Sequence, residues 1–309
     1  MRRVFPSQAA PPFDGARNGI PLRGRAGGRP VIRRVLAGLG GLVVAAWLAV
    51  CAAPADNFHF VLLGDRTGEA QPGVYERVWR ESAAAQPAFV LSVGDTIQGL
   101  NDATAEAEWQ EAMRLVAPYG RIPLYLVPGN HDIWGEASER LFRQYAGRAP
   151  HYGFDFGGAH FTVLDNSRSD EWPAEELAWL EGDLRAHAAA PVKFVVSHRP
   201  SWLIDAALGN TYAPLHLIAR RYGVCCVVAG HVHQLIHAEL ESVTYLSLPS
   251  AGGHLRLSGK YEDGWFFGWT RVEVRDGKAV FQVHALDGPA TPLSAWGRAG
   301  LLAGRATAN

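Results

Sequence analysis

The 309-residue sequence is poor in cysteine and contains no internal repeat. Its three cysteines are Cys51 and the adjacent pair Cys225 and Cys226. Adjacent side chains on a strand point to opposite faces, so we do not expect this pair to form a disulfide. The sequence therefore lacks the pattern of small disulfide-stabilised exported domains, and its hydrophobic content of 48% must supply the stabilising core.

Positive charge is scarce outside the N-terminal segment. Residues 1–55 contain eight arginines and a single acidic residue, Asp14. The remaining 21 basic and 29 acidic residues leave residues 56–309 with a formal net charge of −8. Nonspecific nucleic-acid binding needs clustered lysine and arginine to neutralise phosphates. Bulk nucleic acid is therefore excluded as an expected partner.

One long hydrophobic run, residues 35–53, follows two arginines and ends beside the small residues Ala53 and Ala55. This pattern is typical of a secretory signal peptide and predicts export to the periplasm or the cell exterior. The run is also long enough to be an uncleaved membrane anchor, and residues 48–51 resemble a lipidation motif ending at Cys51. Residues 1–55 are thus predicted to be an N-terminal extension with a signal peptide or a membrane attachment, and translation beginning near Val31 is a further alternative.

From residue 58 onward, short β-branched or hydrophobic runs alternate with amphipathic helical stretches, which predicts an α/β fold. We expect strands at residues 60–63, 89–93, 124–127, 161–164, 193–196 and 225–229, and helices at residues 106–116 and 174–185. After residue 233 the pattern predicts strands alone, at residues 243–248, 264–274 and 279–284, with Asp276-Gly277 as a hairpin turn. These last strands are expected to form a second sheet packed on the first.

The predicted organisation is a single catalytic domain at residues 56–288, followed by an unordered tail at residues 289–309. The tail sequence has no hydrophobic period.

Five short polar motifs occur in order, four of them at or just after the end of a predicted strand, where ligands collect on open α/β sheets. They are Gly64-Asp65-Arg66-Thr67, Gly94-Asp95-Thr96-Ile97-Gln98, Gly129-Asn130-His131-Asp132, Ser197-His198-Arg199-Pro200 and Gly230-His231-Val232-His233. Asp65, Asp95 and Asn130 are 30 and 35 positions apart, each about one βαβ repeat, so they are expected to lie side by side. A single Gly-Asp pair is usually only a turn. The five motifs together predict a metal site.

These motifs resemble those of the calcineurin-like metallophosphoesterases, a family that includes purple acid phosphatases and related diesterases. The resemblance spans about residues 58–235 and implies a four-layer α/β/β/α sandwich. It also implies that Asp95 bridges two metal ions, that Asn130, His198 and His231 complete one site, and that Asp65 and His233 belong to the other. The mixed oxygen and imidazole ligands suit Fe, Mn or Zn, and the sequence does not choose among them.

The sequence departs from the family at the first motif. The family usually has a histidine ligand at the position of Thr67, and purple acid phosphatases instead supply a tyrosine at the position of Gln98. The amide oxygen of Gln98 is a candidate replacement ligand, with simple hydrogen bonding nearby as the alternative. The sequence therefore predicts that the first metal site is weak or easily lost.

The resemblance implies hydrolysis of phosphoric mono- or diesters by a hydroxide that bridges the metals, with His131 as general acid and Asp132 orienting its ring. Arg66 and Arg199 are candidate phosphate-binding residues, although each is also placed to form a structural ion pair. Substrate choice is expected to depend on loops at residues 134–152 and 202–212, where Trp134 and Trp202 are candidate pocket walls. The alternative is a catalytically degenerate metal-binding or interaction protein. The sequence does not indicate the substrate or the oligomeric state.

Overall fold

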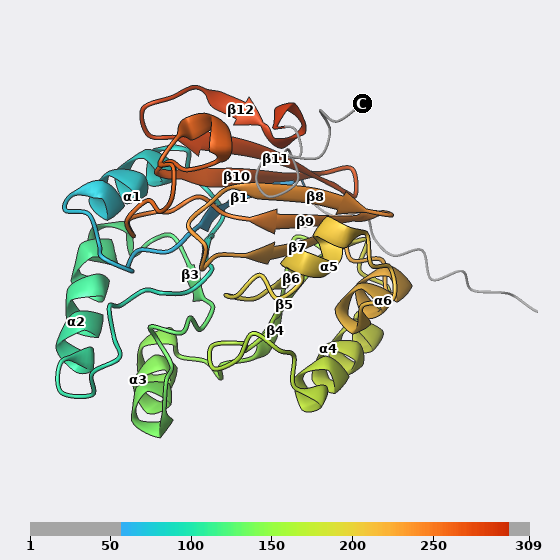
Figure 1. Ribbon diagram of the computed structural model, residues 1–309, viewed down its shortest axis with the longest axis horizontal. Coiled ribbons are helices and arrows are strands. Elements are labelled where there is room, and N and C mark those ends of the chain that lie inside the picture. Colours follow the sequence, from blue (N-terminus) through green and yellow to red (C-terminus); the bar gives the residue numbers. More distant parts are fainter. Residues whose placement is uncertain (1–56, 297–309) are drawn as a thin grey trace, which may run out of the picture. The chain divides into compact units, whose positions relative to one another are not determined.

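The computed structural model describes residues 57–296 (Figure 1), and in this part of the chain the strands form two six-stranded sheets. The first sheet has the order β12-β11-β10-β1-β2-β3. It consists of β1 (Phe58–Leu63), β2 (Val90–Ser92), β3 (Leu124–Leu126), β10 (Gly268–Arg275), β11 (Lys278–Ala285) and β12 (Ala290–Pro292). Strands β1, β2 and β3 are parallel, so their carboxyl ends meet at one edge.

The second sheet has the order β4-β5-β6-β7-β9-β8. It consists of β4 (Tyr152–Phe156), β5 (Ala159–Val163), β6 (Val192–Val196), β7 (Cys226–Ala229), β8 (Ile236–Leu240) and β9 (Val243–Ser247). Strands β5, β6, β7 and β9 are parallel, and β4 and β8 are antiparallel edge strands. The carboxyl ends of β6 and β7 therefore also share one edge.

Helices cover the outer face of each sheet. They are α1 (Val74–Ala84), α2 (Ala105–Val116), α3 (Glu136–Ala146), α4 (Ala174–Ala186), α5 (Leu203–Leu208) and α6 (Pro214–Arg221). Figure 1 shows α1, α2 and α3 on one side of the paired sheets and α4, α5 and α6 on the other. Val78 and Trp79 of α1 pack against the first sheet, whereas Leu180 of α4 packs against the second.

The space between the sheets is filled by a buried hydrophobic cluster rich in phenylalanine. Phe60 of β1 meets Phe161 of β5 at a centroid distance of 5.2 Å, and Phe161 stacks on Phe194 of β6 at 4.8 Å. Residues of β1 alternate between this interior and the helix-covered face, which explains why the strand has almost no polar position. The predicted four-layer α/β/β/α sandwich is confirmed.

The prediction for the C-terminal strands is wrong in its pairing. Strands β10 and β11 do not form the second sheet; β10 pairs antiparallel with β1 in the first sheet, with Phe60 opposite Val272. The free edge of β1 explains this arrangement, because an unpaired buried strand edge leaves backbone groups without partners. The expected hairpin turn is present, and Asp276 and Gly277 have φ values of 51° and 71°.

The predicted unordered tail is also wrong for residues 290–296. Strand β12 pairs with β11, and Trp296 packs on Phe266 with ring centroids 5.3 Å apart. These contacts are distant in sequence and leave no periodic pattern in the tail itself. Residues 1–56 and 297–309 lie outside the described residues, so the predicted signal peptide or anchor at residues 35–53 does too. Among residues 57–296, no helix is long and apolar enough to cross a membrane.

Candidate metal centre

The carboxyl ends of parallel strands position the predicted ligands. Asp65, Asp95 and Asn130 follow β1, β2 and β3 of the first sheet. His198 and His231 follow β6 and β7 of the second sheet. The two packed sheets therefore bring the motif residues together at one edge, as the motif spacing predicted for Asp65, Asp95 and Asn130 and the family resemblance implied for the histidines.

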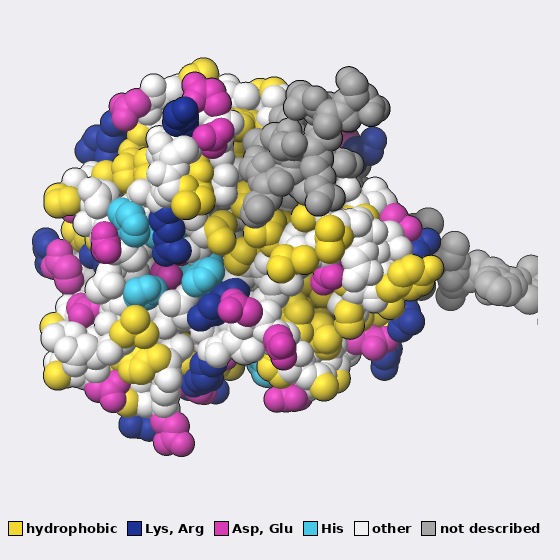
Figure 2. All heavy atoms as spheres, viewed as in Figure 1, with side chains coloured by type: hydrophobic (Ala, Val, Ile, Leu, Met, Phe, Trp, Pro, Cys, Tyr) yellow, Lys and Arg dark blue, Asp and Glu magenta, His cyan; other side chains and the backbone are white. Residues whose placement is uncertain are grey.

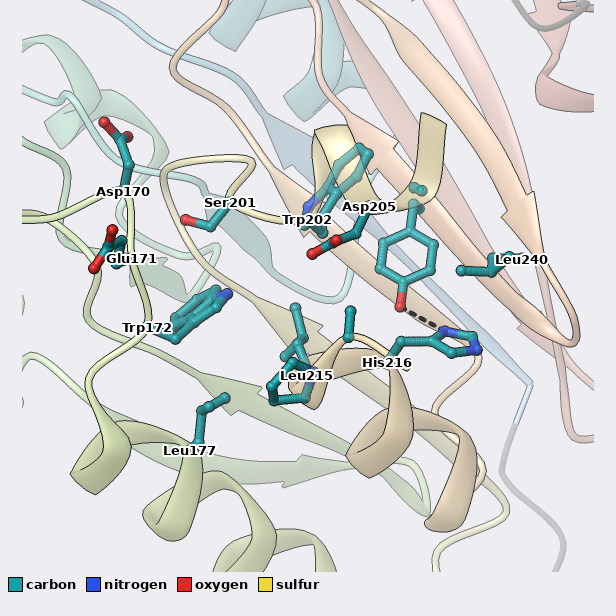
Figure 3. A pocket seen from close by; sticks show the side chains of 14 residues that line it. Asp170, Glu171, Trp172, Leu177, Ser201, Trp202, Asp205, Leu215, His216 and Leu240 are labelled. Atoms are coloured by element: carbon teal, nitrogen blue, oxygen red, sulfur yellow. Dashed lines mark hydrogen bonds between the residues drawn. The ribbon is translucent and has the colours of Figure 1, made fainter. Parts of the chain in front are cut away.

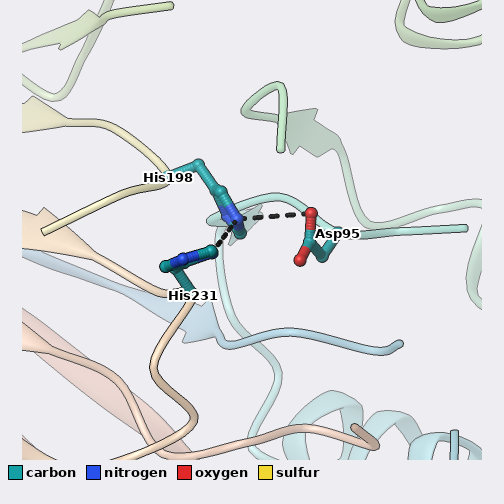
Figure 4. A group of neighbouring side chains, drawn as sticks. All are labelled: Asp95, His198 and His231. Atoms are coloured by element: carbon teal, nitrogen blue, oxygen red, sulfur yellow. Dashed lines mark hydrogen bonds and ion pairs between the residues drawn. The ribbon is translucent and has the colours of Figure 1, made fainter. Parts of the chain in front are cut away.

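Four of these side chains form a tight cluster around one imidazole nitrogen, and Figure 4 shows three of them, Asp95, His198 and His231. Nε2 of His198 lies 3.2 Å from Oδ1 of Asp95 and 3.2 Å from Nδ1 of His231. The same nitrogen lies 3.0 Å from Oδ1 of Asn130. His198 and Asp95 are buried, so water does not separate these groups from one another. We call these four residues the four-ligand half of the centre.

Hydrogen bonding fixes the orientation of the central ring. Nδ1 of His198 donates to the carbonyl oxygen of Val93 at 2.9 Å, which leaves Nε2 facing the cluster. A single ring proton can satisfy only one of the three neighbouring atoms, whereas a metal ion attracts all of their lone pairs. Buried carboxylate, amide and imidazole donors converging on one point fit a transition-metal ion.

Burial and neighbouring charges shift the pKa values of the side chains in this cluster. Burial lowers the pKa of His198, but the negative charges of Asp95 and Asp65 outweigh burial and raise it to about 9. Burial lowers the pKa of His231 to about 4, assisted by the positive charge of His198. Burial alone would raise the pKa of Asp95, yet His198 holds it below its ordinary value. The carboxylates of Asp95 and Asp65 therefore favour a positive charge at the ring of His198.

The remaining predicted ligands, Asp65 and His233, are also buried. Nε2 of His233 lies 3.3 Å from Oδ2 of Asp65 and has no hydrogen-bond partner among the described residues. Nδ1 of His233 donates to the carbonyl oxygen of His254 at 2.8 Å, so Nε2 is the nitrogen directed at Asp65. An unpartnered buried nitrogen beside a carboxylate is consistent with a second ion. We call Asp65 and His233 the two-ligand half.

Thr67 and Gln98 form a hydrogen bond where the family supplies another ligand. The hydroxyl of Thr67 donates to Oε1 of Gln98 at 2.6 Å, and the backbone N–H of Glu69 donates to the same oxygen at 3.2 Å. Both lone pairs of this oxygen are therefore engaged. These contacts favour the hydrogen-bonding role for Gln98 over the ligand role.

Backbone strain and close approach mark the same loops. Asp95, His231 and His233 have positive φ values of 52°, 68° and 59°, a conformation that non-glycine residues adopt mainly where the surrounding structure enforces it. A Cβ atom on Gly129 would lie 2.2 Å from Oδ1 of Asp95, and one on Gly230 would lie 2.4 Å from Oδ1 of Asp65. Each glycine is thus required because the carboxylate of a predicted ligand lies against its backbone.

The structure corrects the predicted role of Asp132. Its carboxylate accepts hydrogen bonds from the backbone N–H groups of Thr96 at 2.8 Å and Gly129 at 2.9 Å, so it joins two motif loops. The ring of His131 is held instead by the carbonyl oxygen of Gln98, 2.5 Å from Nδ1. Burial and the charge of Asp95 raise the pKa of Asp132 to about 7. A carboxylate that bonds backbone amides is not placed to orient the neighbouring imidazole.

Two of the arginines near the centre already have protein partners. Arg66 donates to the carbonyl oxygen of Thr96 at 2.9 Å, and Arg199 forms an ion pair with Asp170 at 2.9 Å.

Sequence reasoning missed a third arginine, Arg256, because it lies outside the motifs. Its charge acts on the buried ring of His233, and a Cβ atom on Gly68 would lie 3.8 Å from its Nη2. Arg256 forms no ion pair within residues 57–296, and its Nε is buried without a partner there.

A second group of potential ligands, Asp155, His160 and His187, is separate from this centre. His160 is near the start of β5, whereas the metal centre lies beyond the end of that strand, next to Asn166. Six residues of extended chain correspond to about 20 Å. His160 donates to Asp155 and Asp183, each at 2.8 Å, so the group connects the β4-β5 hairpin to α4.

Comparison with known proteins identifies the family of the chain. The family model "Calcineurin-like phosphoesterase" matches residues 58–235. Tartrate-resistant acid phosphatase type 5 of Rattus norvegicus is 28% identical over 261 residues, which cover 70% of this chain and 78% of that protein. The 3',5'-cyclic adenosine monophosphate phosphodiesterase CpdA of Escherichia coli is 26% identical, with coverage of 74% and 84%.

Solved structures agree on the fold. A purple acid phosphatase from yellow lupin superposes with a TM-score of 0.59 at 14% identity, covering 77% of this chain and 53% of that one. Two sheets with motif residues at their shared edge define a metal-dependent α/β/β/α hydrolase. The chain belongs to the calcineurin-like phosphoesterase family, and it is a metallophosphoesterase.

Proposed function

We propose that this protein hydrolyses phosphoric mono- or diesters at the edge shared by its two sheets. The observation that supports the proposal most directly is the four-ligand half, in which Asp95, Asn130 and His231 surround Nε2 of His198 at 3.0 to 3.2 Å. Asp65 and His233, with Asp95, would hold the second ion. Bound metal ions would neutralise phosphate oxygens and make water nucleophilic at neutral pH.

His131 is the proposed proton donor. Its Nδ1–H donates to the carbonyl oxygen of Gln98, which fixes the ring and leaves Nε2 free to exchange a proton. The backbone N–H of His131 also donates to Oδ1 of Asp95 at 2.9 Å, so the residue is anchored to a proposed metal ligand. A protonated Nε2 can give its proton to the leaving alkoxide, which is a poor leaving group when unprotonated.

Arg256 is the proposed phosphate-binding arginine. Its guanidinium lies beside the two-ligand half and has no carboxylate partner within residues 57–296. A guanidinium can bind two phosphate oxygens in parallel. Arg66 and Arg199, which already bond protein groups, are better suited to positioning the motif loops.

The test compares hydrolysis of an aryl phosphate and an alkyl phosphate by the wild type and His131→Ala, each loaded with Mn, Fe or Zn. We expect a loss of about a hundredfold or more on the alkyl ester and a much smaller loss on the aryl ester, because an aryl oxide leaves without a proton. Equal losses on both esters would contradict the proton-donor role. The diester to monoester rate ratio of the wild type then identifies the subclass.

The second candidate function is a degenerate metal-binding protein, which the Thr67 to Gln98 hydrogen bond favours. No turnover of either ester with any of the three metals, in protein that still binds metal, would support it. Location outside the cytoplasm stays a prediction from residues 35–53. A mature N-terminus near Asp56 in protein isolated from its native host would support that prediction.

A further inference from the structure

A cavity of about 280 Å³ opens beside the loop that carries His198. It lies among α4, α5, α6 and the segment before α4 (Figure 3), and its walls include Trp172, Leu177, Trp202, Leu215 and Tyr245. In Figure 2, a hydrophobic region adjoins the histidines on the same face of the molecule. This cavity has no role in the metal chemistry described above.

One buried side chain connects the cavity wall to the metal centre. Oδ1 of Asn166 accepts hydrogen bonds from the backbone N–H groups of His198 at 3.1 Å and Arg199 at 3.0 Å. Nδ2 of Asn166 donates to Oγ of Ser201 at 3.1 Å, and Ser201 lines the cavity. The cavity therefore begins three residues from a proposed metal ligand. The same hydrogen-bonded loop thus carries a proposed ligand and a residue of the cavity wall.

The cavity is negatively charged. Its lining contains the carboxylates of Asp170, Glu171 and Asp205, and none of its described lining residues is lysine or arginine. Asp170 is neutralised by Arg199. Glu171 and Asp205 have no cationic partner within residues 57–296, and Asp205 accepts a hydrogen bond only from the neutral Asn210 at 2.7 Å. An anionic organic group would be repelled here.

Two indole rings form part of the lining, and both are short of a partner. Trp202 is 3% exposed, and Nε1 of Trp202 and of Trp172 is buried without an acceptor. Figure 3 shows the Asp205 carboxylate and the Trp172 ring facing the same space. Indole faces attract cations, and a nearby carboxylate strengthens that attraction. The unpaired N–H groups can donate to an ester or hydroxyl oxygen next to the cationic group.

We propose that this cavity binds the ammonium-bearing alcohol part of a phosphate ester, a quaternary or protonated amine. The proposal rests on the proposed phosphoesterase function and names its substrate class. The metal centre binds the phosphate, Trp172 and Trp202 surround the ammonium group, and Asp205 and Glu171 balance its charge. The oxygen of a water molecule forms a new bond to phosphorus as the bond between phosphorus and the alcohol oxygen breaks, and the leaving alkoxide takes up one proton to become the free amino alcohol.

The kinetic test uses phosphocholine and 3,3-dimethylbutyl phosphate, which have the same shape and differ in the positive charge. With the metal-loaded full chain, we expect kcat/KM for phosphocholine to exceed that for the neutral ester by about tenfold or more. Asp205→Asn removes one charge at constant shape and is expected to reduce this ratio severalfold. Glu111→Gln, which removes an exposed carboxylate on α2, should leave the ratio unchanged.

A binding test separates failure of the cavity from failure of catalysis. Choline and the neutral 3,3-dimethylbutanol are titrated against tryptophan fluorescence, and we expect tighter binding of choline, weakened in Asp205→Asn. An aryl phosphate that is hydrolysed, with equal kcat/KM for the charged and neutral esters, would overturn the cavity proposal and leave the proposed function standing. If no ester is hydrolysed, preferential choline binding still supports the cavity, and equal binding overturns it. A preference for adenosine 5'-monophosphate over phosphocholine would also overturn it.

Discussion

The two halves of the metal centre differ in how completely the chain builds them. In the four-ligand half, three atoms lie within 3.2 Å of Nε2 of His198. In the two-ligand half, Asp65 and His233 face each other at 3.3 Å. Thr67 and Gln98 stand where the family supplies a further ligand, and here they form a hydrogen bond with each other. The chain therefore supplies more side chains to one half of the predicted centre than to the other.

The largest effect is expected when the complete half is broken. His198→Ala removes the atom on which the other three ligands converge, so we expect phosphoesterase activity to fall by more than about a hundredfold and the tightly bound ion to be lost. Metal content measured by mass spectrometry after dialysis checks the prediction. Thermal unfolding of the variant controls for misfolding. Retention of the tight ion in folded His198→Ala would contradict the assignment.

Gly129→Ala disturbs the same half through the backbone. The added Cβ would lie 2.2 Å from Oδ1 of Asp95, so the loop must shift. We expect a loss of stability of about 2 kcal/mol and a fall in activity, measured by urea unfolding and ester hydrolysis. The matched control is Gly182→Ala within α4, where a Cβ has no neighbour within 4 Å and should be neutral or stabilising. Equal behaviour of the two variants would argue against the close approach.

The Thr67→His variant adds an imidazole to the two-ligand half, at the position where the family usually has a histidine. We expect the weaker metal ion to bind about tenfold more tightly, because imidazole is a better ligand than a hydroxyl. Calorimetric titration of the dialysed protein measures this affinity. Thr67→Ser keeps the hydrogen bond to Gln98 and serves as the control. An unchanged affinity in a folded Thr67→His variant would show that a missing histidine is not what weakens this half.

The smallest effect concerns the distant group around His160. Burial lowers the pKa of His160, but hydrogen bonds to Asp183 and Asp155 outweigh it, so the pKa is raised from 6.5. The charged ring therefore stabilises the fold fully below pH 6.5, and this contribution is lost as the pH rises through the folded-state pKa. We expect the stability difference between the wild type and His160→Gln to shrink as the pH rises from 6 to 9, measured by thermal unfolding. A loss of activity in a His160→Gln variant whose stability is unchanged would instead link this group to the metal centre.

Local sequence patterns were sufficient to predict that the candidate ligands lie close together and to predict most strands. The spacing of one βαβ unit predicted that Asp65, Asp95 and Asn130 lie side by side, and the glycine before Asp95, Asn130 or His231 predicted a sharp turn at a strand end, because both are local features of the chain. The amphipathic stretches of α2 and α4 were predicted within one residue at each end.

Features that depend on distant contacts could not be predicted in this way. The pairing of β10 with β1 follows from a free sheet edge more than 200 positions away in sequence. The loop expected at residues 134–152 contains α3, whose buried residues are only Ser138 and Phe142, too few to give a clear amphipathic pattern. Trp134 donates to Asp102 at 3.0 Å, whereas Trp202 lines the cavity, and no sequence pattern distinguished them. Arg256 became a candidate only when its place beside His233 was known.

The most direct test of the unequal halves is the metal stoichiometry of the purified full chain before and after exhaustive dialysis, combined with calorimetric titration of the returned ion. The account predicts that one ion per chain is retained and that a second returns with clearly weaker affinity. Two ions retained after dialysis, with equal affinities, would contradict it.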